Sequence, residues 1–148
     1  MKRAIDKYQV SLKVVFRDGD KMLSLAKDKG SFAGLYDFPG GRVDVVEFET
    51  DFMEILAREI SEEIGDVEYE LERRPVGMGR HRIAADGEAP EIHVLYVLHE
   101  AQWKSGTVKI SEEHSGYKWL DVEEVRKAPE RFFKSGNLEA VKTYLGVR

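Results

Sequence analysis

Three glutamates in the segment from Phe52 to Ile64 have the spacing of one helix face. Glu59, Glu62 and Glu63 stand at i, i+3 and i+4, and at about 100° per residue their side chains fall together. Like charges at this spacing destabilise an isolated helix by roughly a few tenths of a kcal/mol per pair. Because a bound cation would relieve the repulsion, the pattern predicts a cation site, although a charge run is also typical of a solvated helix surface.

A glycine-rich turn precedes this helix. Gly40 and Gly41 follow Pro39, and glycines let the backbone approach a ligand closely and offer it a carbonyl oxygen. Mg²⁺ prefers oxygen ligands, keeps several waters, and binds through a few carboxylates together with the phosphates of a substrate. A turn carbonyl beside three carboxylates therefore predicts a divalent-cation site for a phosphate-bearing substrate.

The elements that must position these residues are strands and helices in mixed order. Strands are predicted over Ser11 to Phe16, Lys21 to Ala26, Val67 to Leu71, Val76 to Ile83, Glu91 to His99 and Tyr117 to Leu120. One helix is predicted over Phe52 to Ile64. A second is predicted to begin after an N-cap at Asp121, and a third covers Leu138 to Leu145 after an N-cap at Asn137. The order is not that of a regular βαβ series, so it predicts an α+β domain with a mixed sheet and two principal helices.

The helix from Phe52 to Ile64 must also bury an apolar side. The same 100° spacing predicts a core-facing stripe of Met53, Ala57, Ile60 and Ile64, with Leu56 at its border. The glutamate face is then expected on another side of the helix.

Composition narrows the function classes. The chain has 148 residues, a formal net charge of −5 and no cysteine, and it is predicted to form a single domain over residues 1–148. The acidic balance opposes a protein whose main task is to bind a nucleic-acid polymer. Without cysteine, thiol nucleophiles, thiolate metal sites and disulfides are excluded. No stretch has the pattern of a signal peptide or a membrane span, so we expect a cytoplasmic protein with no membrane partner; the sequence does not predict its oligomeric state.

The order of the turn and the helix residues resembles the Nudix hydrolase family. The family's box is written G-x5-E-x7-R-E-U-x-E-E-x-G-U, where U is aliphatic. This chain has Gly41 and Glu47 at the first two fixed places, and Arg58 to Gly65 reads Arg-Glu-Ile-Ser-Glu-Glu-Ile-Gly. Asp66 stands where the pattern has its last aliphatic residue.

The loop inside the box is longer than the pattern. Gly41 to Arg58 spans 17 positions, three more than in the family. Counted back from Arg58, the early glutamate place falls on Thr50, beside Glu49. Both Glu47 and Glu49 are therefore candidates for that place.

The resemblance implies a fold and a reaction. The fold would be an α/β/α sandwich with a mixed β-sheet between helices. The reaction would be attack of water on a phosphorus of a nucleoside diphosphate derivative, which breaks the diphosphate linkage and depends on Mg²⁺, with Mn²⁺ also possible. Nucleoside triphosphates, nucleotide sugars and dinucleoside polyphosphates all remain open as the small-molecule substrate. The alternative is a module of the same fold that binds a nucleotide without hydrolysing it.

The resemblance also implies roles for the residues of the box. Glu62 and Glu63 would be metal ligands, helped by the carbonyl oxygen of Gly40. Glu59 would be a further ligand or a base acting on water. Arg58 would pair with the early glutamate and hold the long loop on the helix.

A second acidic pair lies later in the chain. Glu112 and Glu113 precede the strand predicted at Tyr117 to Leu120 and resemble a loop that supplies a further carboxylate in some family members. We favour Glu113 for this role, although exposed acids are equally common in loops.

Arg80 and Arg82 flank His81 on a predicted strand, where alternation puts the two arginines on one face. They are candidates for binding substrate phosphates, against the alternative of an ordinary exposed strand face. Phe32, Tyr36 and Tyr96 could stack on a base, but core packing is favoured for each.

Overall fold

The computed structural model of the chain describes residues 1–30 and 33–148. Its strands are β1 (Tyr8–Asp18), β2 (Lys21–Ala26), β3 (Tyr36–Asp37), β4 (Gly40–Arg42), β5 (Glu68–Ile83), β6 (Ile92–Ser105) and β7 (Gly116–Asp121). The α-helices are α1 (Phe52–Ile64), α2 (Val122–Lys127) and α3 (Ser135–Leu145), with 3-10 turns η2 (Val45–Glu47) and η3 (Pro129–Arg131). Among the described residues, no helix is long and apolar enough to cross a membrane.

The strands form one mixed sheet. Its order is β3-β2-β1-β6-β5, with β4 paired to β1 and β7 paired to β2. β1 and β6 run parallel, whereas the other neighbouring strands run antiparallel. The chain from Tyr36 to Arg42 leaves β2 as β3 and joins β1 as β4, and the amide of Val14 donates to the carbonyl of Pro39 at 2.9 Å. The Pro-Gly-Gly turn is therefore part of the sheet.

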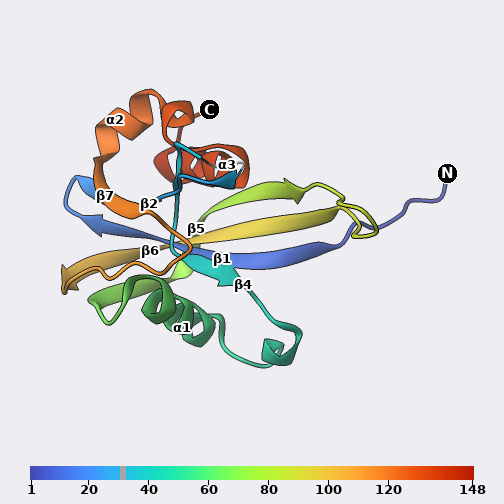
Figure 1. Cartoon of the computed structure of the whole chain (residues 1–148), viewed down its shortest axis with the longest axis horizontal. Coiled ribbons are helices and arrows are strands. Elements are labelled where there is room, and N and C mark those ends of the chain that lie inside the picture. Colours follow the sequence, from blue (N-terminus) through green and yellow to red (C-terminus); the bar gives the residue numbers. More distant parts are fainter. Residues whose placement is uncertain (31–32) are drawn as a thin grey trace.

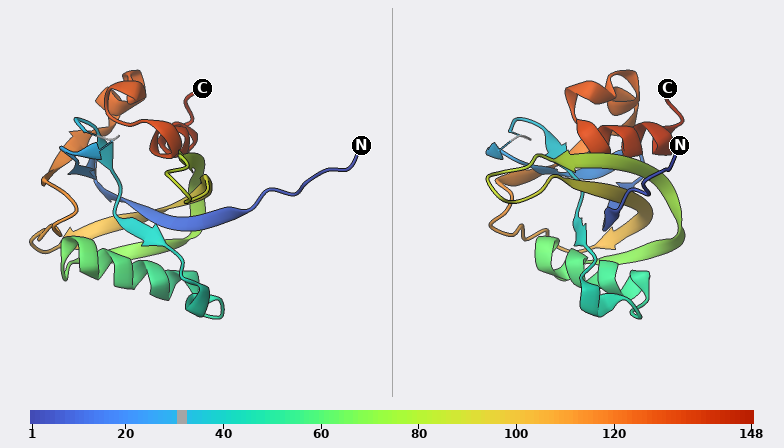
Figure 2. Two further views of the ribbon diagram at one scale, coloured as in Figure 1. Left: turned by 45° about the vertical axis from the view of Figure 1, so that its right-hand side comes forward. Right: turned by 90° about the vertical axis from the view of Figure 1, so that its right-hand side faces the viewer.

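Helices cover both faces of the sheet, as Figures 1 and 2 show: α1 lies on one side, and α2 and α3 lie on the other. The alternation of β1 explains this arrangement. Leu12, Val14 and Phe16 pack in the cluster that holds α1, whereas Val15 packs in the cluster under α2 and α3. The architecture is the expected α/β/α sandwich with a mixed sheet between helices.

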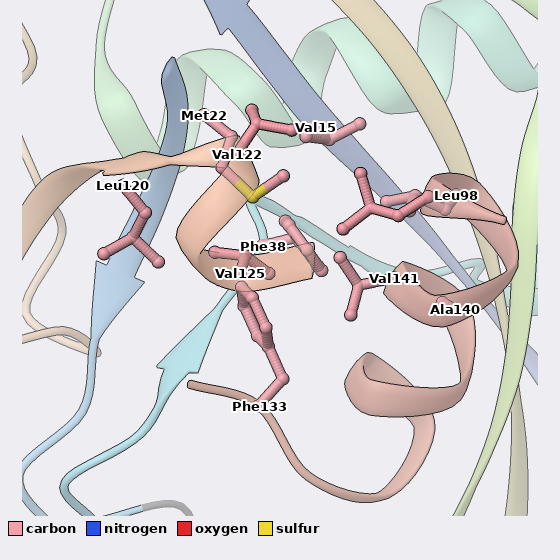
Figure 3. Packing of buried hydrophobic residues seen from close by; sticks show 11 residues of the cluster. Val15, Met22, Phe38, Leu98, Leu120, Val122, Val125, Phe133, Ala140 and Val141 are labelled. Atoms are coloured by element: carbon pink, nitrogen blue, oxygen red, sulfur yellow. The ribbon is translucent and has the colours of Figure 1, made fainter. Parts of the chain in front are cut away.

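The core under α2 and α3 anchors the turn. Phe38 is fully buried and its ring stacks on Phe133 at 4.8 Å between centroids, with Val125 and Val141 beside them (Figure 3). Since Phe38 directly precedes Pro39, this packing fixes the point from which the turn starts.

Two predicted strands are one strand in the structure. β5 runs without a break from Glu68 to Ile83, and its register with β6 shifts on both sides of Pro75. Proline has no amide hydrogen to donate to the ladder, and a bulge accommodates it. The interruption read from the sequence is therefore a bulge and not a connection.

The predicted core stripe of α1 is partly wrong. The buried apolar residues are Ile55, Leu56, Ile60 and Ile64, while Met53 is half-buried and Ala57 is exposed. Glu63 is buried among them. The helix is turned so that Glu63 is buried while Glu62 stays exposed, which helix periodicity alone does not show.

The predicted N-cap at Asn137 is also wrong. α3 begins at Ser135 after Lys134, and Asn137 lies inside its first turn, 1% exposed. Its side-chain amide donates to the Asp37 carboxylate at 3.0 Å. The Asn137 side chain therefore binds a residue 100 positions away in the sequence and does not cap the helix.

Candidate active site

One cavity of about 490 Å³ gathers the acidic residues that the sequence singled out. Gly40 of β4 lines it together with Glu59, Glu62 and Glu63 of α1. Glu113, from the loop before β7, completes the set. Three segments that are separate in the sequence thus meet at one hollow between the Pro-Gly-Gly turn and the C-terminal half of α1.

The two glycines let the turn and the helix approach each other. Gly40 has a φ of +145°, and a Cβ there would collide with the carbonyl oxygen of Leu12. A Cβ on Gly41 would collide with the carboxylate of Glu59. The Glu59 side chain therefore rests directly on the backbone of the turn. Gly40 requires glycine because backbone atoms surround it, whereas a side chain at Gly41 would displace the Glu59 carboxylate.

Arg58 holds the long loop on α1. Its Nη2 donates to Glu47 Oε2 at 2.9 Å and lies 3.3 Å from Glu59 Oε1, and its Nη1 donates to Glu62 Oε1 at 3.0 Å. The other oxygen of Glu47 accepts the amide of Asp44 at 2.9 Å in the capping box of η2. These two hydrogen bonds hold the pKa of Glu47 below its usual value. Of the two candidate glutamates, the structure places Glu47 on Arg58.

Glu63 has a buried carboxylate whose hydrogen bonding is incomplete. It is 8% exposed, and its Oε2 has no hydrogen-bond partner among the described residues. Burial raises its pKa to about 7, although the charges of Lys13 and His114 oppose the rise. Burial also raises the pKa of Glu59. An oxygen of this kind costs free energy unless it is protonated or meets a cation, so the donor set fits a divalent metal ion.

The carboxylates of the cavity do not converge on one cation position in this structure. Across residues 1–30 and 33–148, no three Asp, Glu or His side chains stand in a metal-holding arrangement. Glu62 is bound to Arg58 instead, and its side chain is 58% exposed. A pair this exposed is worth about 0–1 kcal/mol, so turning Glu62 toward a cation costs little.

The loop before β7 is tied to the end of α1. The amides of Lys109 and Ser111 donate to the carbonyls of Ile64 and Glu63 at 2.9 and 3.1 Å, which satisfies acceptors that a helix end leaves open. Within this loop Glu113 lines the cavity of the carboxylates, whereas Glu112 lines a neighbouring hollow.

A buried ion pair at the base of the cavity was missed by the sequence analysis. Lys13 Nζ lies 3.2 Å from Asp37 Oδ1, with the two side chains 10% and 12% exposed. The same Asp37 oxygen accepts the amide of Phe38 at 2.8 Å and the side chain of Asn137 at 3.0 Å, and its other oxygen lies 3.5 Å from His114 Nε2. The signal in the sequence is a lysine between two apolar residues, Leu12 and Val14, of a predicted strand.

The charges of this pair stabilise each other. Burial alone would raise the pKa of Asp37, but Lys13 and the hydrogen bonds from His114 and Asn137 outweigh it and hold the pKa well below its usual value. Burial alone would lower the pKa of Lys13, and Asp37 again reverses the direction. Lys13 also lies over the ring of Tyr96, 5.2 Å from its centroid. A fixed positive charge therefore stands beside the carboxylate cavity.

Arg80 and Arg82 do not line this cavity. Arg80 pairs with Glu139 at 3.2 Å and Arg82 with Glu91 at 3.5 Å, and both line a separate hollow near the start of β1. His81, between them, borders both hollows. The two arginines thus line the same hollow, in line with strand alternation, but of these three residues only His81 lines the carboxylate cavity.

The aromatic candidates lie in different places. Tyr96 borders the cavity and is 8% exposed. Tyr36 packs at the edge of the core, 6.5 Å from the ring of Phe133. Phe32 lies outside the described residues.

Comparison with known proteins places the chain in a family. The family model described as NUDIX domain matches residues 7–141. Nucleoside triphosphatase NudI of Escherichia coli (strain K12 / DH10B) is 32% identical over 116 residues, which cover 76% of this chain and 80% of the relative.

Two solved structures share the fold. The MutT protein of Methanosarcina mazei Go1 aligns with a TM-score of 0.67 at 21% identity, covering 95% of this chain and 94% of that chain. An ADP-ribose pyrophosphatase of Streptococcus suis 89-1591 aligns with a TM-score of 0.63 at 16% identity, covering 95% and 91%.

The family model and the nucleoside triphosphatase relative identify a hydrolase of phosphoric anhydrides built on this sandwich. The chain belongs to the Nudix family. The class of its substrates is that of nucleoside diphosphate derivatives.

Proposed function

We propose that this protein is a Mg²⁺-dependent pyrophosphohydrolase, with Mn²⁺ able to replace Mg²⁺. The observation that carries the proposal is the buried Glu63 carboxylate, whose Oε2 has no hydrogen-bond partner among residues 1–30 and 33–148 and which lines the same cavity as Gly40, Glu59 and Glu62. A binding module that never held a cation would gain nothing from such a group, because a buried unpaired oxygen costs free energy.

The first role of the site residues would be to bind the cation. Glu59, Glu62 and Glu63 would hold the cation, with the carbonyl oxygen of Gly40. When bound, the cation neutralises negative charge on the substrate phosphates and lowers the pKa of a coordinated water.

Two acids and one arginine would act around that centre. Glu59 or Glu113 would accept a proton from the attacking water, since both line the cavity. Arg58 would keep α1 and the η2 loop in register, which positions the carboxylates.

Among the open substrates we favour a nucleoside triphosphate. The support is the relative at 32% identity, which is a nucleoside triphosphatase. The likeness to an ADP-ribose pyrophosphatase, at 16% identity, concerns the fold alone. Lys13, held beside the carboxylates by Asp37, supplies positive charge suited to a polyphosphate.

A substrate panel with Mg²⁺ and Mn²⁺ tests the proposal. Nucleoside triphosphates, nucleotide sugars and dinucleoside polyphosphates would be assayed for released phosphate, pyrophosphate and nucleoside monophosphate. Glu63→Gln should lower kcat by at least about 100-fold, because a metal supplies several kcal/mol and each 1.36 kcal/mol is about tenfold. Glu54→Gln is the matched control, since Glu54 lies on the same helix, is exposed and does not line the cavity.

Two results would overturn the proposal. Near-full hydrolysis in excess EDTA would show that no cation is needed. Equal losses in Glu63→Gln and Glu54→Gln, with both variants folded by circular dichroism, would show that the cavity is not the site.

A further inference from the structure

The loop that carries Glu47 exposes large apolar side chains. Val45, Val46 and Phe48 are 91%, 85% and 90% exposed. The loop is nevertheless ordered by the capping box of η2, in which Asp44 and Glu47 satisfy each other's backbone amides. Consecutive apolar residues held out on an ordered turn are unusual for a surface and mark a contact site.

Val45 and Phe48 border an apolar hollow of about 580 Å³. Its apolar lining consists of Tyr8, Val10, Val43, Val45, Phe48 and Phe52. None of the described residues that line it also lines the carboxylate cavity. The hollow, which we call the loop groove, is therefore a second site on the molecule.

The charge around the loop groove limits what can occupy it. The loop carries four acidic residues, Asp44, Glu47, Glu49 and Asp51. Glu47 is paired with Arg58 and Asp51 with Arg73, so Asp44 and Glu49 supply the negative charge that these arginines do not compensate. Two such loops placed face to face would bring like charges together, which costs free energy at an interface. An occupant with apolar side chains and positive charge fits better.

The first seven residues of the chain have that character. Residues 1–7 read MKRAIDK, and they are all exposed, with Met1 117% and Ile5 84% exposed. Lys2, Arg3 and Lys7 supply the positive charge. This segment, which we call the arm, projects from the start of β1 away from the rest of the fold (Figures 1 and 2).

The base of the arm is held against β6 by Asp6. Asp6 Oδ2 lies 2.7 Å from His93 Nδ1 on β6, which sets the direction in which residues 1–5 leave the molecule. An extended run of five residues reaches about 17 Å. The arm therefore carries Met1 and Ile5 out to where a second molecule can meet them.

The edge of β1 beside the groove suits an extended segment. β4 pairs with β1 over Ser11 to Lys13, and Val43 donates to the carbonyl of Val10. Tyr8 and Gln9 lie beyond this ladder and line the groove. Added strands bind such edges through main-chain hydrogen bonds, with side-chain pockets giving specificity.

We propose that two copies of this chain form a dimer by exchanging arms, so that residues 1–5 of each arm occupy the loop groove of the other copy. Ile5 and Met1 meet the apolar lining, and Lys2 and Arg3 meet the acidic loop. The contact is isologous, because the same two surfaces are used twice around a two-fold axis.

Sedimentation equilibrium between about 1 and about 500 µM tests the association. We expect a concentration-dependent monomer–dimer equilibrium that weakens as salt is raised, because charge contributes. Phe48→Ser should raise the dissociation constant at least about tenfold. Met78→Ser is the control, since Met78 is 51% exposed on β5 and lies outside the groove; it should leave the constant unchanged.

Disulfide trapping tests the exchange itself. Because the chain has no native cysteine, a disulfide can form only between the introduced cysteines. Ile5→Cys and Val45→Cys variants of different tag length would be mixed and oxidised. We expect the mixed disulfide to dominate over both like pairs.

Several outcomes would overturn the proposal. A monomer at all concentrations, or a dimer insensitive to Phe48→Ser, would refute the groove. Dominant Val45→Cys like pairs would indicate loop-to-loop contact. Closure within a single chain of the double variant, at concentrations where wild type is monomeric, would show that the arm fills its own groove.

Discussion

The buried pair of Lys13 and Asp37 should carry a large share of the stability, and Asp37→Asn tests this. The substitution removes the charge but keeps an oxygen in place for the Phe38 amide and the Asn137 side chain. Lys13, whose side chain is 10% exposed, would then be a buried charge that has lost its direct ion-pair partner.

The expected cost follows from that burial. Breaking one side of a buried ion pair destabilises a protein by about 3–5 kcal/mol, against a total of about 5–15 kcal/mol for a domain. At about 2–4 °C per kcal/mol for a chain of this size, the melting temperature should fall by roughly 6–20 °C. The exposed pair of Arg73 and Asp51, with side chains 73% and 42% exposed, should be worth about 0–1 kcal/mol.

Urea unfolding at pH 7 measures the difference, with Arg73→Gln as the control. Because the folded pKa of Asp37 is lowered, its contribution is present above the unfolded pKa of about 3.9 and is lost as the pH falls through the folded value. The gap between wild type and Asp37→Asn should therefore be full at pH 7 and shrink below about pH 4. A loss no larger than that of Arg73→Gln, or a gap independent of pH, would refute the reasoning.

Three further predictions concern the site. Gly41→Ala should lower kcat at least about tenfold with a smaller effect on the urea midpoint, because the new Cβ would collide with the Glu59 carboxylate; unchanged turnover would contradict that contact. In double-mutant cycles on kcat/KM, Arg58→Ala should couple to Glu47→Gln by about 0.5–3 kcal/mol and not to Glu49→Gln, and equal coupling to both would argue against the observed pair. Since burial raises the pKa of Glu63 to about 7 and a ligand must lose its proton before it binds a metal, Mn²⁺ affinity by calorimetry should fall roughly fivefold from pH 7 to pH 6; Glu63→Gln should abolish this dependence, and a persistent slope would assign it elsewhere.

Local elements were predicted well where neighbouring residues alone decide them. α1 and β2 have the predicted bounds, since Asp51 caps the helix through the amide of Met53 and the hairpin turn at Gly19 has the required positive φ. The α/β/α sandwich also followed, because the family resemblance carried it. The orientation of α1 did not follow, since the sheet can receive more than one side of a helix that is apolar over a wide arc.

The sequence by itself determined the chemistry: the helix spacing of Glu59, Glu62 and Glu63, and the glycine turn before them, set which oxygens can gather. The tertiary structure decided which of those groups are buried and what stands beside them. It placed Glu47 on Arg58, turned Arg80 and Arg82 away from the cavity, and brought Lys13, His114 and Asn137 to Asp37 from 24, 77 and 100 positions away. Local propensity extends over a few residues, whereas these contacts exist because strand pairing and core packing bring distant segments together, and only then do burial and charge set the properties of the site.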